Sequence, residues 1–234
     1  MRENKGTAPD LDSRSLLKKV IVLFALLFII LGSMFFLPAW TFNYWQAWIY
    51  LLTLSVPMIF LVRFLYKHDP QLLERRMRMR ERQKAQKLIV VLSWPFFLLA
   101  FIIPGFDHRL HWSNVPLAVI VISDVLVLLG YLFVALVFKT NTYASRIVEV
   151  EKGQKVITTG PYAIVRHPMY LGQMVLFMFS PLALGSYWAM ISVLLLIPLF
   201  VTRIRSEERE LLASLDGYKE YVAKTRYRLI PGIW

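Results

Sequence analysis

The sequence HPMYLGQMVLFMFSPLALGSYWAMISVLLLIPLFVT, residues 167–202, holds no Asp, Glu, Lys or Arg over 36 positions. A single helix of that length would measure about 54 Å, whereas the hydrocarbon layer of a membrane is only about 30 Å thick. Gly185 and Ser186 lie near the middle of the stretch and favour a turn. The stretch therefore predicts a hairpin of two short membrane helices, over residues 168–184 and 187–202.

Four other stretches of the chain are apolar and nearly free of charge. They span residues 20–38, 44–62, 88–106 and 115–138, and each is long enough to cross the hydrocarbon layer. Hydrophobic residues make up 57% of the 234-residue chain, only 18% are charged, and the mean hydropathy is +0.53. This composition excludes a soluble globular, a disordered or a collagen-like protein. We expect an all-α integral membrane protein with about six transmembrane helices.

The basic residues gather in four segments between the predicted spans. Of the 27 Lys and Arg residues, five lie in 1–19, nine in 63–87, five in 139–168 and seven from residue 203 onward. Six spans bring all four segments to one side of the membrane, and Arg109 alone lies on the other. The positive-inside rule then predicts a multi-pass protein with both termini in the cytoplasm. The net charge of +12 thus reflects membrane topology and indicates no nucleic-acid partner.

The chain has no cysteine, which excludes a disulfide scaffold, an iron–sulfur site, a thiolate zinc site and a cysteine nucleophile. Asp107, His108 and His111 have metal-like spacing, but they fall on the side of the membrane opposite the basic segments. We therefore predict no metal cofactor. Asp124 lies within a predicted span, where an acid is a functional candidate by default. We favour a contact between helices there, with Ser123 as a partner.

The segment before the hairpin holds a first group of polar residues. Residues 160–161 are Gly-Pro, a turn signal, and Pro168 suits the first turn of a helix with His167 at its cap. The amides of the three residues after Pro168 are expected to be free, and such a helix start binds anions such as a carboxylate or phosphate. The alternative is an ordinary helix start with a capping histidine and an arginine that reaches the headgroups. The spacing leaves both interpretations open.

The tail holds a second group. On a helix that continues the last span, Arg203 and Glu207 are four residues apart and share a face, and Glu208 follows. A glutamate just past a membrane span can receive a ligand ammonium, although spacing alone favours a solvated run of charges. Further on, aromatic residues and a late arginine can either wall a nucleotide pocket or anchor the tail on the headgroups; they are Tyr218, Tyr221, Tyr227, Arg228 and Trp234.

Three motifs in these segments carry a resemblance to a known family. The run GPY-x3-RHPMYLG occupies residues 160–172, R-x3-EE-x2-L residues 203–211, and Y-x2-Y-x6-R-x2-P residues 218–231. Together they resemble the isoprenylcysteine carboxyl methyltransferase family, which belongs to a wider group with the phospholipid methyltransferases. Further matches upstream extend the resemblance over most of residues 67–234.

The resemblance implies a membrane enzyme that uses S-adenosylmethionine, held on the cytoplasmic side by the C-terminal half of the chain. Carried over by position, Arg203 and Glu207 would be catalytic. The residues that would line the cofactor pocket are Gly160, Pro161, Tyr162, Arg166, His167, Tyr170, Glu207 and Glu208. Helix rotation decides which of the two glutamates faces the cofactor, and the sequence leaves that open.

The predicted spans and the resemblance together divide the chain into three regions. Residues 1–19 would be a cytoplasmic N-terminal segment. Residues 20–138 would form a four-helix transmembrane region with a basic cytoplasmic loop at 63–87. Residues 139–234 would form the methyltransferase catalytic region, with the helical hairpin at 168–202 and a cytoplasmic cofactor-binding tail.

The prediction for function is methylation of a carboxylate or other head group on a lipophilic small molecule or lipidated substrate that enters from the membrane lipids. A carboxylate is already ionised and needs no general base, whereas an amine needs a proton removed, with His167 or a glutamate as the candidate. Two alternatives stay open: a phospholipid N-methyltransferase, and an NADPH-dependent sterol or steroid reductase-like enzyme, whose families have a similar RHP-x-Y hairpin. A transporter or scaffold is disfavoured, because the first four spans hold few polar residues to line a path.

Overall fold

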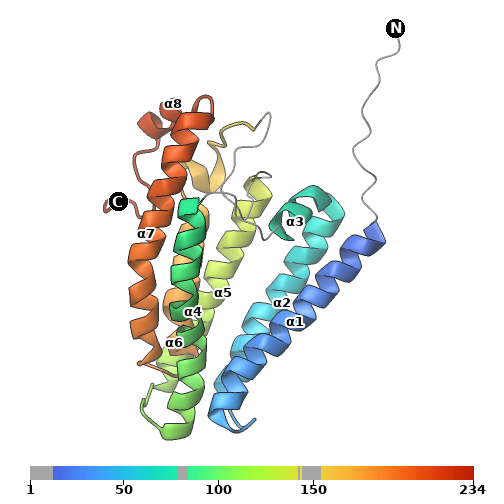
Figure 1. The fold of residues 1–234 in the computed structure, drawn as a ribbon, viewed down its shortest axis with the longest axis vertical. Helices are drawn as coiled ribbons and strands as arrows, with labels where there is room; N and C mark the ends of the chain where they lie inside the picture. Colours follow the sequence, from blue (N-terminus) through green and yellow to red (C-terminus); the bar gives the residue numbers. More distant parts are fainter. Residues whose placement is uncertain (1–12, 78–83, 142, 144–153) are drawn as a thin grey trace.

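The computed structural model describes residues 13–77, 84–141, 143 and 154–234. Over these residues the chain is helical, with one isolated β-bridge, so the predicted all-α class is confirmed (Figure 1). Within the part of the chain that the structure describes, five helices are long and apolar enough to cross a membrane: α1 (Ser13–Ala39), α2 (Trp45–His68), α4 (Lys84–Leu110), α5 (Leu117–Thr140) and α7 (Ala189–Ser214). The shorter helices are α3 (Pro70–Met77), the 3-10 helix η1 (Gly160–Ala163), α6 (Pro168–Ala183) and α8 (Tyr218–Lys224).

The charge-free stretch folds as the predicted hairpin. Helix α6 ends at Ala183 and α7 begins at Ala189, within two residues of the predicted bounds. Gly185 has φ +77°, a conformation that favours glycine, and the amide of Ser186 donates to the carbonyl of Pro181 to close the turn. Helix α6 has only 16 residues, about 24 Å of helix, and so it is shorter than the five long helices. The long α7 continues through Ser214, as the prediction of a helix beyond the last span requires.

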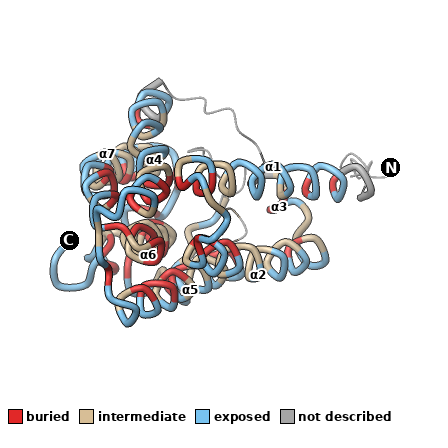
Figure 2. Tube along the Cα trace, turned by 90° about the horizontal axis from the view of Figure 1, so that it is seen from below, coloured by how far each residue is buried: buried red, intermediate tan, exposed pale blue. Residues whose placement is uncertain are grey.

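The long helices run alternately up and down in Figure 1, so loops join neighbours at two ends of the bundle. The end of α5, the start of α6 and α8 lie together at the upper end, which we call the α8 end. The ends of α1 and α4 and the turn between α6 and α7 lie at the opposite end. Buried residues line the surfaces where helices meet, and the outward faces are exposed (Figure 2). Those exposed faces are largely apolar, as expected of helices in contact with lipid.

Helices α5 and α6 pack closely enough to need glycine on both sides. A Cβ on Gly130 would lie 3.0 Å from the carbonyl oxygen of Gly172, and one on Gly172 would lie 2.7 Å from a methyl group of Val134. Small residues allow such backbone approach between membrane helices. The crossing fixes α6 against α5 and thereby holds the start of α6, at Pro168, near the end of α5.

At the opposite end, polar side chains tie the helix ends together. Asp107 is buried and accepts hydrogen bonds from the amide of Ser113 at 2.6 Å, from its hydroxyl at 2.7 Å and from the hydroxyl of Ser186 at 2.5 Å. His108 stacks on the ring of Tyr44 and lies 3.1 Å from the carbonyl oxygen of Asn43. Asp107 and His108, which have metal-like spacing in the sequence, thus have partners in the protein itself.

Within the membrane, Asp124 of α5 forms a hydrogen bond with Thr53 of α2. The expected contact between helices is therefore present, but it uses Thr53 rather than Ser123. Parts of three predicted regions lie outside the described residues: 1–12 of the N-terminal segment, 78–83 of the basic loop, and 142 and 144–153 of the catalytic region. The division into 1–19, 20–138 and 139–234 stays a prediction.

Candidate functional site

The candidate site begins at the start of α6. His167 is the N-cap residue and Pro168 is the first helical residue, as predicted. The prediction of three free amides is wrong, because the amides of Tyr170 and Leu171 both donate to the carbonyl oxygen of His167, at 3.1 and 3.3 Å. These bonds close the first turn of the helix. The helix start therefore offers fewer donors to an anion than the spacing suggests.

The C-terminal tail is attached to this helix start through the backbone. The amide of Arg166 donates to the carbonyl of Tyr227, and the amide of His167 donates to the carbonyl of Arg228, both at 2.9 Å. Val165 and Tyr227 form the isolated parallel bridge. Residues 165–167 and 227–228 are thus held side by side, although some 60 residues separate them in the chain. This pairing brings the arginine of the last sequence motif to the histidine of the first.

Glu208 of α7 joins two arginines at this junction. Its Oε1 lies 2.8 Å from Nε of Arg166 as an ion pair, and its Oε2 accepts a hydrogen bond from Nε of Arg228 at 2.5 Å. The side chains of Arg166 and Glu208 are each 5% exposed, whereas that of Arg228 is 36% exposed. A buried charge needs such compensation, because water no longer solvates it. The three residues form a charged cluster that joins α6, α7 and the tail.

His167 lies against this cluster and is kept neutral. Its Nε2 is 3.9 Å from Oε1 of Glu208, too far for a hydrogen bond, and the residue is 4% exposed. Burial, together with the positive charges of Arg166 and Arg228, lowers the pKa of His167 to about 3. The imidazole therefore carries no charge near neutral pH.

The lowered pKa of His167 predicts an acid-sensitive fold. The unfolded chain binds a proton on this residue below pH 6.5 while the folded chain does not, so the free energy of unfolding falls as the pH drops below 6.5. We expect a loss of about 1.5 kcal/mol between pH 6.5 and pH 5. Thermal unfolding of the detergent-solubilised protein over this range measures it. His167→Gln should flatten the profile, whereas His111→Gln, at an exposed residue, should leave it unchanged. If the stability of His167→Gln still fell with pH as that of the wild type does, His167 would not be the cause of the acid sensitivity.

A second group of polar side chains lies beside the charged cluster and is joined by hydrogen bonds. We call it the second hydrogen-bonded group. The hydroxyl of Tyr170 donates to Oε2 of Glu207 at 2.6 Å, and Nε of Arg203 donates to the same hydroxyl at 3.0 Å. Tyr170 thus connects the two α7 residues that share a helix face. Its ring packs in an apolar cluster with Ile204 and Leu229, which fixes its position. Glu207 and Glu208, adjacent in the chain, have separate sets of partners.

Tyrosines of η1 and α8 lie near these charges. The hydroxyl of Tyr221 donates to the carbonyl of Tyr162 at 2.7 Å, and the hydroxyl of Tyr162 accepts from the side chain of Asn141 at 2.8 Å. Burial raises the pKa of Tyr162 to about 12. Burial and the nearby charges of Glu208 and Glu207 raise that of Tyr218, which is 4% exposed. Among the described residues, the hydroxyl of Tyr218 has no hydrogen-bond partner.

Gly160 and Pro161 begin η1, which carries Tyr162 to the end of α5. Gly160 has φ +58° and lies against the side chain of Thr140, where a Cβ would be 3.1 Å from a methyl group. The Gly-Pro pair therefore sets the turn. Its link to the expected pocket wall is indirect, because the pair positions Tyr162, which follows it.

The predicted site residues gather at the α8 end of the bundle. Of the predicted residues, Arg166 and Glu208 belong to the charged cluster and the neutral His167 lies against it. Tyr170, Arg203 and Glu207 form the second hydrogen-bonded group. The structure adds residues that the site prediction left out. Arg228, Tyr218 and Tyr221 were signalled by the third motif and by the aromatic residues of the tail, which the sequence offered as a possible pocket wall. Asn141 and Thr225, whose carbonyl lies 3.4 Å from a guanidinium nitrogen of Arg166, had no signal in the sequence.

Comparisons with known proteins agree with the motifs. Residues 119–213 match the family model described as the isoprenylcysteine carboxyl methyltransferase (ICMT) family. A curated relative, the cobalt-zinc-cadmium resistance protein CzcN of Cupriavidus metallidurans, is 28% identical over 109 residues, which are 44% of this chain and 49% of that protein. The match thus spans about half the length of that relative.

Among solved structures, that of the eukaryotic intramembrane Ras methyltransferase ICMT aligns with 96% of this chain and 87% of that one, at 20% identity and a TM-score of 0.41. A TM-score this low does not by itself establish a common fold. The family match covers α5 from residue 119, α6, and α7 up to residue 213, so it contains the first two motifs but not the third. Residues 119–213 of this multi-pass membrane protein are thus similar to the isoprenylcysteine carboxyl methyltransferase family.

Proposed function

We propose that the protein is a membrane methyltransferase that transfers the methyl group of S-adenosylmethionine to a carboxylate on a lipophilic acceptor. The observation that carries this proposal is the meeting of two groups of charged residues at one end of the bundle. Arg166, Glu208 and Arg228 form one group, and Arg203 and Glu207 form the other through Tyr170. The family match over 119–213 supports a methyltransferase.

The chemistry of the donor fits these groups. S-adenosylmethionine carries a sulfonium, an ammonium, a carboxylate and an adenine ring. Both oxygens of Glu208 contact arginines, so we assign the ammonium to Glu207 and the carboxylate to Arg228, whose side chain is partly exposed. Arg166 then acts by holding Glu208. The adenine or the sulfonium would lie against tyrosine faces, which attract cations and stack with flat rings; the candidates are Tyr162, Tyr218 and Tyr221.

The reaction itself needs alignment more than proton transfer. A carboxylate oxygen of the acceptor attacks the methyl carbon, the new C–O bond forms as the S–C bond breaks, and the sulfonium leaves as a neutral thioether. Holding both reactants in line supplies much of the rate. A negative acceptor head group would be drawn to Arg203, which lies nearer the membrane than Glu207 by about one helix turn.

The state of His167 favours a carboxylate over an amine as acceptor. An amine has to lose a proton during methylation, and an effective base has a pKa near the working pH. The pKa of His167 is lowered to about 3, so the neutral imidazole is a weak base. A carboxylate acceptor arrives ionised and needs no such base. The phospholipid N-methyltransferase alternative therefore lacks support from this residue.

The topology belongs to the same proposal. We place the α8 end in the cytoplasm, because the basic segments of the sequence lead to it. Reporter fusions test this at six positions and should read out, in, out, in, out, in; the positions follow Trp40, Lys87, Trp112, Gln154, Gly185 and Trp234. An external reading at Trp234 would contradict both the topology and the site of cofactor entry.

Binding and transfer are tested separately. S-adenosylmethionine should raise the melting temperature of the purified protein in detergent, since a ligand that binds only the folded state stabilises it, by about 2.7 kcal/mol at 100 times the Kd. Glu207→Gln should weaken that binding roughly 10- to 150-fold through the loss of a charge-assisted contact. The matched control is Glu210→Gln on the same helix, which should bind as the wild type does.

Transfer is measured with a labelled methyl group and three acceptors in detergent. An S-prenylated cysteine derivative with a free carboxylate, or a long-chain fatty acid, should become an ester, and phosphatidylethanolamine should stay unlabelled. Labelling of the phosphatidylethanolamine alone would favour the N-methyltransferase. Stabilisation by NADPH without stabilisation by S-adenosylmethionine would favour the reductase-like alternative.

A further inference from the structure

Among the described residues, the end of the bundle opposite the candidate site carries a single Lys or Arg. Arg109 is the only such residue between positions 88 and 138, and it lies in the last turn of α4. Its guanidinium lies 5.3 Å from the ring centre of Trp40, which directly follows α1. Among the described residues, no carboxylate lies within ion-pair distance of Arg109; the nearby Asp107 is occupied by Ser113 and Ser186.

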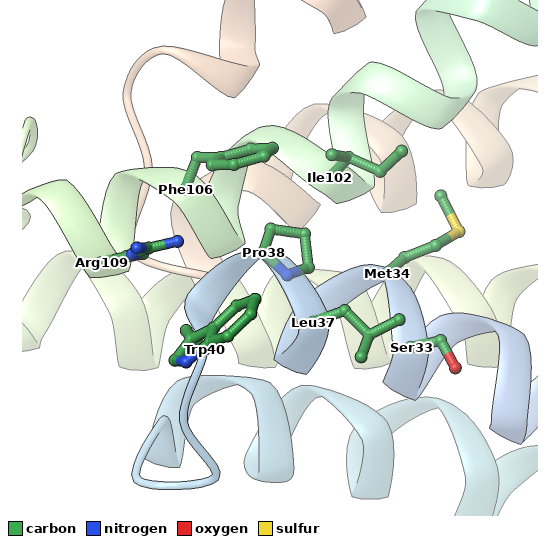
Figure 3. A pocket seen from close by; sticks show the side chains of 8 residues that line it. All are labelled: Ser33, Met34, Leu37, Pro38, Trp40, Ile102, Phe106 and Arg109. Carbon is green, nitrogen blue, oxygen red and sulfur yellow. The ribbon is translucent and has the colours of Figure 1, made fainter.

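An apolar cleft of about 450 Å³ leads from Arg109 along the outer face of α1 and α4 (Figure 3). Figure 3 shows Arg109 and Trp40 near each other at one end of the cleft, with Ser33 at the other. The remaining lining side chains are apolar: Met34, Leu37, Pro38, Ile102 and Phe106. Leu37 is 70% exposed and Trp40 is 80% exposed, so the cleft is open to the surroundings of the bundle.

The cleft extends over a defined length of α1 and α4, and these two helices are in contact beneath it. From Arg109 to Ile102, and from Trp40 to Ser33, the lining spans seven residues of helix, about 10 Å. Gly105 is on the adjoining face of α4, where a Cβ would lie 2.5 Å from the carbonyl oxygen of Phe35 in α1. The two helices therefore touch along that inner seam, and the cleft is the groove that remains on their outer side.

This geometry matches one leaflet of a membrane. Exposed tryptophans beside Trp40 mark the headgroup level at this end, as aromatic belts do; they are Trp45, Trp48 and Trp112. Arg109 is thus at headgroup level, and the groove extends about 10 Å into a hydrocarbon half-layer of about 15 Å. The groove fits an acyl chain, and the guanidinium fits a phosphate.

We propose that this cleft is a binding site for a phospholipid of net negative charge from the leaflet opposite the candidate methyl-transfer site. The acyl chain lies in the groove, and the phosphate pairs with Arg109. A zwitterionic lipid carries its own cation, which offsets the attraction, so an isolated arginine selects the anionic head group. The site is independent of the proposed methyl transfer, and its test has no catalytic readout.

The absence of native cysteines allows a local test. Leu37→Cys, labelled with a fluorophore and reconstituted in phosphatidylcholine vesicles, reports on the groove when small fractions of spin-labelled phosphatidylglycerol or spin-labelled phosphatidylcholine are added. Quenching by phosphatidylglycerol should exceed that by phosphatidylcholine roughly fivefold at equal fraction. The matched control is Ile49→Cys, which is exposed at a similar depth on α2 and should show no preference.

Arg109→Gln in the Leu37→Cys background should abolish the preference, and Arg109→Lys should keep most of it. Equal quenching by the two lipids at Leu37, an equal preference at Ile49, or a preference that survives Arg109→Gln would overturn the proposal. Protection of the label from both lipids would mean that a protein surface, such as a second copy of this chain, covers the groove, and this too would overturn it.

Discussion

Glu208→Gln should destabilise the protein by about 3–5 kcal/mol, the cost of leaving a buried charge without its partner. The substitution keeps the shape of the side chain and removes only the charge. Arg166, whose side chain is 5% exposed, would then lie unpaired beside α7. For a chain of this length that loss corresponds to a fall of about 6–20 °C in melting temperature. Thermal unfolding in detergent, followed by size-exclusion profile, measures it.

Two further variants make the expected order specific. Arg228→Gln should cost less than Glu208→Gln, because Arg228 is 36% exposed and Glu208 keeps its contact with Arg166. Glu220→Gln, at an exposed residue of α8, should change the melting temperature little. If Glu208→Gln had the same melting temperature as Glu220→Gln, the charged cluster would not hold the tail to the helices.

The membrane helices were predictable because a membrane imposes a length. The six apolar stretches correspond to α1, α2, α4, α5, α6 and α7, and the turn at Gly185 follows from a run too long for one crossing. The short α6 is the departure, since a composition argument cannot tell whether 16 residues cross a membrane or pack inside a bundle. The N-cap at His167 was predictable because proline is favoured in the first turn of a helix.

The ion pairs of the candidate site could not be predicted from the sequence. Arg166 and Glu208 are 42 positions apart, and their contact depends on how α6, α7 and the tail pack. The rotation of α7 about its axis decides which of the two glutamates is buried. Ile204 and Glu208, four residues apart, are both buried, whereas Glu207 is half-buried beside Tyr170. In the sequence, Glu208 lies between Ile204, Leu211 and Leu215, which form an apolar stripe on the helix, and this was the one local sign that its charge is buried. A buried glutamate needs a positively charged partner, and the sequence contains several candidates without indicating which of them is the partner.

Arg203→Met should lower turnover about 100-fold while S-adenosylmethionine binds within a few-fold of its wild-type affinity. The reason lies in the direction of the hydrogen bonds: Arg203 donates to the hydroxyl of Tyr170, which itself donates to Glu207. Removal of the arginine leaves the bond to Glu207, so the proposed ammonium site keeps its shape. What is lost is a positive charge that would hold the anionic acceptor in line with the methyl group, and loss of one such group typically costs 100-fold or more in kcat.

Two variants separate this role of Arg203 from general loss of charge. Arg203→Lys keeps the charge without the planar guanidinium and should recover part of the turnover. Arg205→Met, at an exposed position two residues further along α7, removes the same charge away from Tyr170 and should leave turnover near wild type. Turnover by methyl-label transfer and affinity by ligand-dependent melting give the two quantities. An equal loss of both in Arg203→Met would make Arg203 a cofactor-binding residue, since binding of the donor would then depend on the same charge as the transfer.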